Sequence, residues 1–513
     1  MSKMLSTLRQ KLRRRERSYT LRIPRQEEAE HLLLLGDPGT GKTQIIHSFL
    51  RQIAARRPPE AAVIYDPACE FIEAHFNAAR GDIILNPLDV RFPYWSPAFE
   101  VRYPTDRKLL AESFFPGRDE KNATPTQFFA KASRAIFARM LEFEPSPTQI
   151  IEWLQDESKI DHLVEGTEHA LLINPNAGNQ RGGVLGSLSD VGDTLKLLPT
   201  QTECRGAISL TEWAAQRRGW MFITSTQDTR EALRALHAAF IDILLKRLMS
   251  TRPEWGREHP CWLIVDEVHA LKRLPALYNG LVEGRKYGLK IVQGTQGRTQ
   301  YDDNYGHLAR TMLAAPHLKI FMRCGEAESA KWIADTIGEE EREKPKIGTT
   351  ASVRDSGRDS INYSTVTERR PVVSREQIMA LPNLHGYWKY EDVVVGFRFP
   401  FHRARQVAPG FLVRERKEMS APMIPGITPE TTTTTAVEAP HQAAPKRLAK
   451  ERNETSVRAQ NRQSPQARTE DTRKASGAVS SAARMPPRAG SRDRTTPPEK
   501  APTTPTIEVE HDY

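Results

Sequence analysis

Short apolar runs alternate with amphipathic stretches along most of the chain. The runs span 31–35, 61–65, 82–85, 219–224, 261–265, 290–293 and 317–322, and polar residues follow most of them. Strands of a parallel sheet are covered on both faces, so they read as continuous apolar runs of this kind. Apolar residues at helical spacing over 44–53, 230–249 and 327–337 predict helices between the strands. The pattern predicts an α/β fold with a mainly parallel central sheet, closed by a last β element at 392–399.

The character of the chain changes between about 104 and 205. Apolar residues recur at helical spacing over 111–115, 128–143 and 147–154, and strand signals vanish. We expect an all-α insert domain here, although an ordinary helical layer of the main domain fits the same pattern.

Two later segments lack a core-forming pattern. The charged, Gly/Ser/Thr-rich segment 340–370 is expected to be a long exposed loop. From about 414 to 513 the composition shifts to Pro, Thr, Ala and Arg. Such a segment cannot bury enough apolar surface to offset its chain entropy, so we expect a disordered C-terminal tail.

A glycine-rich loop follows the first apolar run and precedes the first predicted helix. It reads Gly36, Asp37, Pro38, Gly39, Thr40, Gly41, Lys42 and Thr43. The glycines let the backbone wrap around a polyphosphate, and the helix N-terminus adds positive potential. Lys42 is placed to reach the β- and γ-phosphates, and Thr43 can offer its hydroxyl to Mg²⁺. The loop therefore predicts a nucleotide-binding P-loop.

A second site signal ends the run 261–265. Asp266 and Glu267 follow four apolar residues, which places them at the carboxyl edge of a central strand, where open α/β sheets bind ligands. Asp266 is expected to hold Mg²⁺ through its water shell, and Glu267 to polarise the attacking water. Together with the P-loop, this pair predicts a nucleotide hydrolase.

Two further polar residues fit the same chemistry. Gln296 ends the next predicted strand, where it could sense the γ-phosphate or orient water. Arg285 lies in a glycine-flanked turn just before that strand and is a candidate arginine finger supplied by a neighbouring subunit. A satisfied strand-end amide and a surface arginine are the plainer interpretations of the two.

Residues 266–269 also read as a DExH box, so a helicase is an alternative. Lys42 and Asp266 lie 224 positions apart, which is wider than superfamily 2 helicases usually allow. A domain-sized insertion must intervene, and the helical region 104–205 supplies it.

Charge and cysteine usage indicate the possible partners and the compartment of the protein. Residues 1–25 hold nine Lys/Arg and one Glu, whereas the whole chain carries a net charge of +10. This basic N-terminal arm could contact anionic lipid or nucleic acid, or could be a solvated terminus. The four cysteines are scattered, which indicates a reduced, cytoplasmic protein. No apolar run approaches the roughly 20 residues that a transmembrane helix needs, and no signal peptide is evident.

Several stretches together resemble the TraD/TrwB family of type IV secretion coupling proteins, the hexameric ATPases that deliver DNA to conjugative secretion machinery. The resemblance covers about 26–413 and rests on 30–36 with the P-loop, 83–89, Trp95-Ser96-Pro97, 219–224, 263–267, 284–286, and Gln296. Members usually carry transmembrane helices ahead of the nucleotide domain, whereas a basic stretch of only about 25 residues precedes it here. A soluble variant, peripheral docking at the inner membrane through the basic arm, and an incomplete reading frame all fit this difference.

The resemblance implies a RecA-like core, ATP with Mg²⁺, homo-hexamer assembly, and DNA binding without strong sequence preference. It also implies a relaxase (or relaxosome) and type IV secretion channel proteins as partners. By position, the nucleotide-site roles fall to Lys42, Thr43, Asp266, Glu267, Gln296 and Arg285. The nucleotide-binding domain is then expected in two parts, 26–103 and 206–413, with the insert between them.

The expected function is ATP-driven recruitment and pumping of DNA to a type IV secretion channel. One alternative is a DNA translocase of the FtsK/HerA type acting outside conjugation. Another is a nucleotide-gated substrate receptor with little motor activity.

Overall fold

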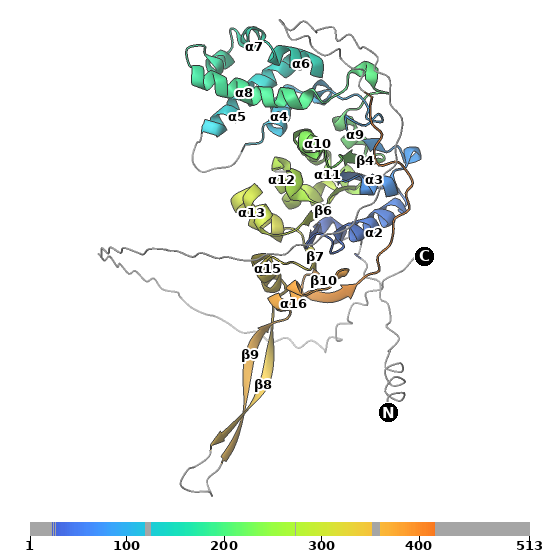
Figure 1. The fold of residues 1–513 in the computed structure, drawn as a ribbon, viewed down its shortest axis with the longest axis vertical. Coiled ribbons are helices and arrows are strands. Elements are labelled where there is room, and N and C mark those ends of the chain that lie inside the picture. The colour runs from blue at the N-terminus through green and yellow to red at the C-terminus, as the bar shows by residue number, and fades with distance from the viewer. Residues whose placement is uncertain are drawn as a thin grey trace, which may run out of the picture. The chain divides into compact units, whose positions relative to one another are not determined.

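A nine-stranded sheet forms the centre of the fold in this computed structural model (Figure 1), which describes residues 23, 25, 27–117, 125–271, 273–350 and 360–415. The strand order is β11-β10-β7-β1-β6-β5-β2-β4-β3. All neighbours from β7 to β3 are parallel, and β10 and β11 add an antiparallel edge. The strands are β1 (Leu32–Leu35), β2 (Ala61–Asp66), β3 (Ile83–Ile84), β4 (Trp220–Thr224), β5 (Cys261–Val265), β6 (Leu289–Thr295), β7 (Leu318–Met322), β10 (His385–Tyr390) and β11 (Val393–Arg398).

Helices connect the strands and cover the sheet. Those outside the helical region are α2 (Lys42–Ala54), α3 (Glu70–His75), α9 (Leu210–Gln216), α10 (Arg230–Met249), α11 (Pro253–Glu258), α12 (Pro275–Glu283), α13 (Thr299–Tyr305), α14 (Ala309–Ala314), α15 (Ala327–Ile337) and α16 (Arg375–Met379). The helices predicted at 44–53, 230–249 and 327–337 are confirmed as α2, α10 and α15.

The apolar strands are buried on both faces because successive side chains point to opposite sides of the sheet. Leu33 and Val63 belong to a core that includes residues of α10 and α12. Leu34 and Ile64 belong to a second core with α2 and α3. This two-sided burial explains why the strands carry no polar alternation.

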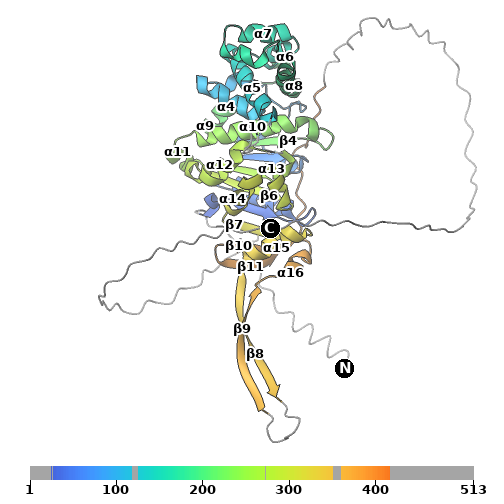
Figure 2. The ribbon, with the colours of Figure 1, turned by 90° about the vertical axis from the view of Figure 1, so that its left-hand side faces the viewer.

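The region 104–205 is helical in its described part. It contains α4 (Pro104–Phe114), α5 (Pro125–Met140), α6 (Pro147–Leu154), α7 (Glu157–Val164) and α8 (Gly178–Leu195). This helical region lies next to α10 (Figure 2). Its helices share one continuous apolar core with the sheet face that carries α10. The contact runs through α4 and α8, which both pack on α10. Over the ranges described, no helix has the length and apolar character needed to cross a membrane.

The expectation of a loop over 340–370 is wrong for the described residues. They form an antiparallel ribbon of β8 (Glu339–Thr350) and β9 (Ser360–Pro371), which pair only with each other. Ion pairs cross the ribbon from Lys344 to Glu368 and from Arg369 to Glu341. Because charged side chains on both strands are exposed, the segment has no apolar alternation that would indicate strands. The edge strand β10 was also not predicted.

Two predicted segments lie outside the described residues: nearly all of the basic arm 1–25, and the tail from 416 to 513. The last described stretch, 399–415, has an extended backbone that follows the sheet edge. Arg414 anchors it by donating to the carbonyls of Pro87, Asp89 and Phe92.

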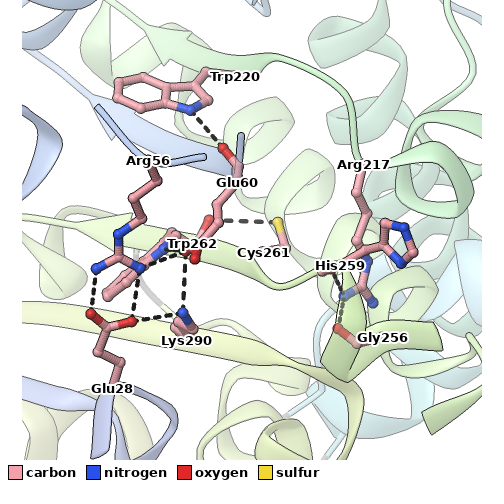
Figure 3. Close-up of polar contacts among 10 residues, drawn as sticks. All are labelled: Glu28, Arg56, Glu60, Arg217, Trp220, Gly256, His259, Cys261, Trp262 and Lys290. Carbon is pink, nitrogen blue, oxygen red and sulfur yellow. Dashed lines mark hydrogen bonds and ion pairs between the residues drawn. The ribbon is translucent and has the colours of Figure 1, made fainter. Parts of the chain in front are cut away.

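Buried polar contacts fasten the amino edge of the sheet, opposite the carboxyl ends of the parallel strands (Figure 3). Glu60 accepts hydrogen bonds from Arg56 at 2.7 Å, Trp262 at 2.6 Å and Lys290 at 3.1 Å, and Lys290 also pairs with Glu28 at 2.7 Å. Trp262 and Lys290 belong to β5 and β6, and Glu28 belongs to the 3₁₀ helix η1 (Glu27–Glu30), while Arg56 and Glu60 lie in the connection between α2 and β2. The network holds the strands in register, which fixes the positions of their opposite ends.

A single arginine gathers the loops on the same edge. The guanidinium of Arg217 donates to the carbonyls of Gly256 at 3.1 Å and His259 at 2.7 Å (Figure 3). It also donates to the carbonyl of Tyr287 at 2.9 Å. These carbonyls belong to the segments just before β5 and β6, so one buried side chain sets where both strands begin.

Candidate nucleotide site

The P-loop wraps between the end of β1 and the start of α2. Gly39 and Gly41 have φ values of 74° and 114°, which are left-handed conformations that favour glycine. Backbone bonds from Gly36 to Thr295 and from Asp37 to Arg323 tie the loop to the ends of β6 and β7. Gly41 gives α2 no side-chain cap, so the N–H groups of the first turn are suited to bind an anion.

Lys42 lies folded over the loop. Its ammonium donates to the carbonyl of Gly36 at 2.6 Å and to that of Asp37 at 3.2 Å. Burial lowers the pKa of Lys42, and the nearby Asp266 and Glu267 carboxylates oppose that shift. The loop therefore holds a partly desolvated cation where an incoming phosphate could replace two carbonyl oxygens.

Thr43 and Asp266 meet directly. The Thr43 hydroxyl donates to Asp266 Oδ2 at 2.9 Å, although the two residues lie 223 positions apart in the chain. The other carboxylate oxygen of Asp266 is buried and has no hydrogen-bond partner among the described residues. Burial raises the pKa of Asp266 to about 6, and Lys42 opposes this rise. A hydroxyl beside an unsatisfied buried carboxylate oxygen is a donor set that fits Mg²⁺.

Glu267 and Gln296 form the second pair of the site. The Gln296 amide donates to Glu267 Oε1, and His269 Nε2 lies 3.4 Å from the same oxygen. Arg230, at the start of α10, places a guanidinium nitrogen 4.0 Å from Glu267 Oε2. Sequence reasoning missed Arg230. The available signal was its place at the first turn of the helix that follows β4, at the same sheet edge.

Lys42, Thr43, Asp266, Glu267 and Gln296 line one cleft of about 600 Å³ at the carboxyl edge of the sheet. The predicted residues on its wall are Pro38, Gly39, Gly41, Lys42, Thr43, Asp266, Glu267 and Gln296. Residues not predicted from the sequence are Gln44, His47, Glu70, Glu73, Leu384, Phe401, Arg403 and Ala404. The cleft thus brings together residues as far apart in the chain as Pro38 and Ala404.

Arg285 lies elsewhere. It belongs to the 3₁₀ helix η8 (Gly284–Tyr287) before β6, is 62% exposed, and pairs with Glu30. Gln296 follows the other end of β6, and seven residues at about 3.3 Å each separate the two ends by roughly 20 Å. Arg285 therefore does not meet Lys42 or Glu267 within one chain.

Comparison with known proteins gives a consistent answer. Residues 17–402 match the family model described as the DNA-binding domain of type IV secretion-system coupling proteins. The coupling protein TraD of Escherichia coli (strain K12) is 26% identical over 413 residues. That alignment covers 77% of this chain and 56% of TraD, so the chain spans little more than half the length of this relative.

Solved structures of the conjugative coupling protein TrwB share the fold. Unbound TrwBdeltaN70 superposes with a TM-score of 0.65 at 26% identity, covering 78% of this chain and 92% of that protein. TrwB in complex with ADP and Mg²⁺ gives a TM-score of 0.65 at 25% identity, covering 78% and 93%. A third structure holds the GTP analogue GDPNP, with the same TM-score, identity and coverage. Since the family match extends over most of the sequence, the chain belongs to the family of type IV secretion-system coupling proteins.

Proposed function

We propose that this protein is an ATP-hydrolysing, DNA-binding coupling protein that recruits DNA and pumps it to a type IV secretion channel. The observation that carries the proposal is the meeting of Thr43 and Asp266 beside the P-loop, next to the Glu267–Gln296 pair. The chain's family and the nucleotides bound by the related TrwB support the same conclusion.

Each residue then has a defined task. The P-loop N–H groups and Lys42 bind the β- and γ-phosphates, while Thr43 and Asp266 would hold Mg²⁺. Mg²⁺ held there would neutralise charge on the phosphates. Glu267 takes a proton from the attacking water, and Gln296 fixes the orientation of that carboxylate.

The proposal also covers the assembly, partners and location of the protein. We infer a homo-hexamer in which Arg285 reaches the nucleotide of a neighbouring copy, because the sheet separates it from the cleft of its own chain. We also infer relaxase and secretion-channel partners, and cytoplasmic location with peripheral inner-membrane contact. We further infer a nucleotide-binding domain of two parts, 26–103 and 206–413, with an all-α insert domain at 104–205 that packs on it. The family match does not favour the FtsK/HerA-type alternative.

The decisive test is the ATPase rate of the purified chain with and without single- and double-stranded DNA, at low and moderate salt. We expect DNA to stimulate turnover and salt to weaken the stimulation, because phosphate contacts release counterions. Lys42→Ala and Glu267→Gln should abolish turnover while the thermal unfolding curve stays cooperative. ATP binding without any DNA stimulation would favour the nucleotide-gated receptor instead, and normal turnover by either variant would refute the site assignment.

A further inference from the structure

We propose that the extended segment 400–414, here called the strap, completes the nucleotide cleft. In this proposal Phe401, with Leu384 beside it, covers the purine base, and Arg403 supplies a second cation for the polyphosphate. This inference rests on the proposed nucleotide-binding function and names the part of the cleft that binds the nucleoside.

The strap crosses the mouth of the cleft and is fixed on both sides of it. The His402 N–H donates to the side-chain oxygen of Gln44 on α2 at 3.1 Å. The Val407 and Ala408 N–H groups donate to the carbonyl of Glu73 on α3, at 2.7 and 3.2 Å. The residues between these two anchors, including Arg403, therefore span the space between α2 and α3.

The strap's starting point packs directly on the P-loop. The Leu384 N–H donates to the carbonyl of Thr40 at 2.9 Å, and the Phe399 N–H donates to the carbonyl of Leu384 at 3.1 Å. A Cβ atom added to Gly41 would lie 2.8 Å from Leu384 and 2.9 Å from Phe399. This close approach places an apolar wall directly beside the phosphate-binding loop.

Phe401 is the exposed part of this wall. Its side chain lines the cleft yet is 65% exposed, and no ring contact covers it within the described part of the chain. By contrast, the nearby Phe397 and Phe399 rings stack on each other, with their centroids 5.9 Å apart. An uncovered aromatic face in a phosphate-binding cleft is suited to stack on a base.

The charge balance of the cleft points to Arg403. The carboxylates on its wall are Glu70, Glu73, Asp266 and Glu267, and the full cations are Lys42 and Arg403. Burial lowers the pKa of His47, also on the wall, to about 4, so His47 adds no charge at neutral pH. Arg403 has no hydrogen bond or ion pair with the residues that the structure describes. A bound polyphosphate would give this guanidinium a partner, and Arg403 would offset part of the negative charge that the polyphosphate adds to that of the carboxylates.

The test compares ADP with inorganic pyrophosphate, each with Mg²⁺, by calorimetric titration of the full chain. Phe401→Ala should raise the Kd for ADP about tenfold and leave the Kd for pyrophosphate unchanged, and Phe401→Tyr should restore ADP binding. Arg403→Ala should weaken both ligands, and Arg403→Lys should recover most of the loss. Val407→Ala is the matched control, since Val407 lies on the same strap, is 56% exposed and does not line the cleft.

The outcomes separate this proposal from the one on which it rests. Lys42→Ala should lose both ligands, and retained binding by that variant would refute the nucleotide site itself. If Lys42→Ala behaves as expected but Phe401→Ala weakens neither ligand, or both equally, the base subsite is wrong. If Arg403→Ala binds pyrophosphate normally, Arg403 is not a phosphate ligand.

Discussion

At the scale of single residues, the interior holds a histidine that hydrogen bonding does not explain. His237 on α10 is fully buried, and neither ring nitrogen has a partner among the described residues. Its ring meets the Tyr65 ring edge-on, with the ring centroids 6.1 Å apart. The Tyr65 hydroxyl also has no hydrogen-bond partner among the described residues. Burial lowers the pKa of His237 to about 3, so the native protein keeps this imidazole neutral.

This residue makes stability depend on pH in a defined direction. The unfolded chain binds a proton at His237 below about 6.5, whereas the native chain does so only near pH 3. The wild-type free energy of unfolding therefore contains a contribution that is present above pH 6.5 and lost as the pH falls toward 3. Leucine binds no proton. The free energy of unfolding of His237→Leu should therefore rise, relative to that of the wild type, by about 1.4 kcal/mol for each unit by which the pH falls through that window.

Urea unfolding of both proteins at pH 7.5, 6.0 and 5.0 measures this difference. Other groups with shifted pKa values, such as Asp66, are present in both chains and cancel. Parallel stability curves would show that His237 is protonated or hydrated in the native state.

At the scale of elements, the amino edge of the sheet depends on a buried ion network. Burial alone would raise the pKa of Glu60, but Lys290, the Trp262 hydrogen bond and Arg56 outweigh burial and lower it. The Glu60 and Lys290 side chains are each 9% exposed, and Glu28 is 4% exposed. Such pairs are costly to break because the remaining charge stays buried.

We expect Glu60→Gln to lower the free energy of unfolding by about 3 kcal/mol. The matched control is Asp193→Asn, which removes an ion pair to Lys196 between side chains that are 67% and 49% exposed. This exposed pair should contribute less than about 1 kcal/mol. Denaturant titrations at neutral pH compare the two variants, and equal losses would mean that water reaches the Glu60 network.

The β8–β9 ribbon is an element of a different kind. Its described side chains are mostly exposed, and its strands pair only with each other. Replacing 343–367 by Asn-Gly should therefore leave the thermal midpoint within about 2 °C, since surface changes seldom exceed about 0.5 kcal/mol. ADP binding should also be unchanged. A large drop in the midpoint would show that the ribbon contributes to the core.

At the scale of the whole molecule, the candidate finger and the cleft lie on opposite edges of one sheet. Arg285 pairs with Glu30 within its own chain, while Lys42 and Glu267 line the cleft roughly 20 Å away by the strand geometry. A single copy thus lacks a group that the proposed mechanism requires. Hydrolysis should depend on assembly.

Mixing two inactive variants tests this dependence. Arg285→Ala should lower kcat by about a thousandfold, and Glu267→Gln should abolish turnover. In mixed rings some interfaces pair an intact Arg285 with an intact Glu267, so part of the turnover should return. Lys286→Ala, at the exposed neighbouring position, should stay active. No recovery at any mixing ratio would contradict a finger that acts between copies.

The local pattern alone was enough for the core of the fold. Apolar runs predict β1, β2 and β4 to β7 because strands buried on both faces must be apolar throughout. The P-loop is equally readable, since Gly39 and Gly41 adopt left-handed φ values that the motif's glycines allow. Asp266 and Glu267 follow from their place at a strand end.

What the sequence could not decide depends on distant residues. Phe401 and Arg403 carry no local signal, and they join the cleft because β10 and β11 return the chain to the P-loop edge. The ribbon is held by pairing between two charged strands rather than by an apolar face, so its composition reads as a loop. Arg285 shows the same limit: its sequence position suggests a finger, but only the sheet's two edges decide that it cannot serve its own chain. Local patterns record burial and backbone geometry, whereas tertiary packing alone determines which distant side chains share a cleft.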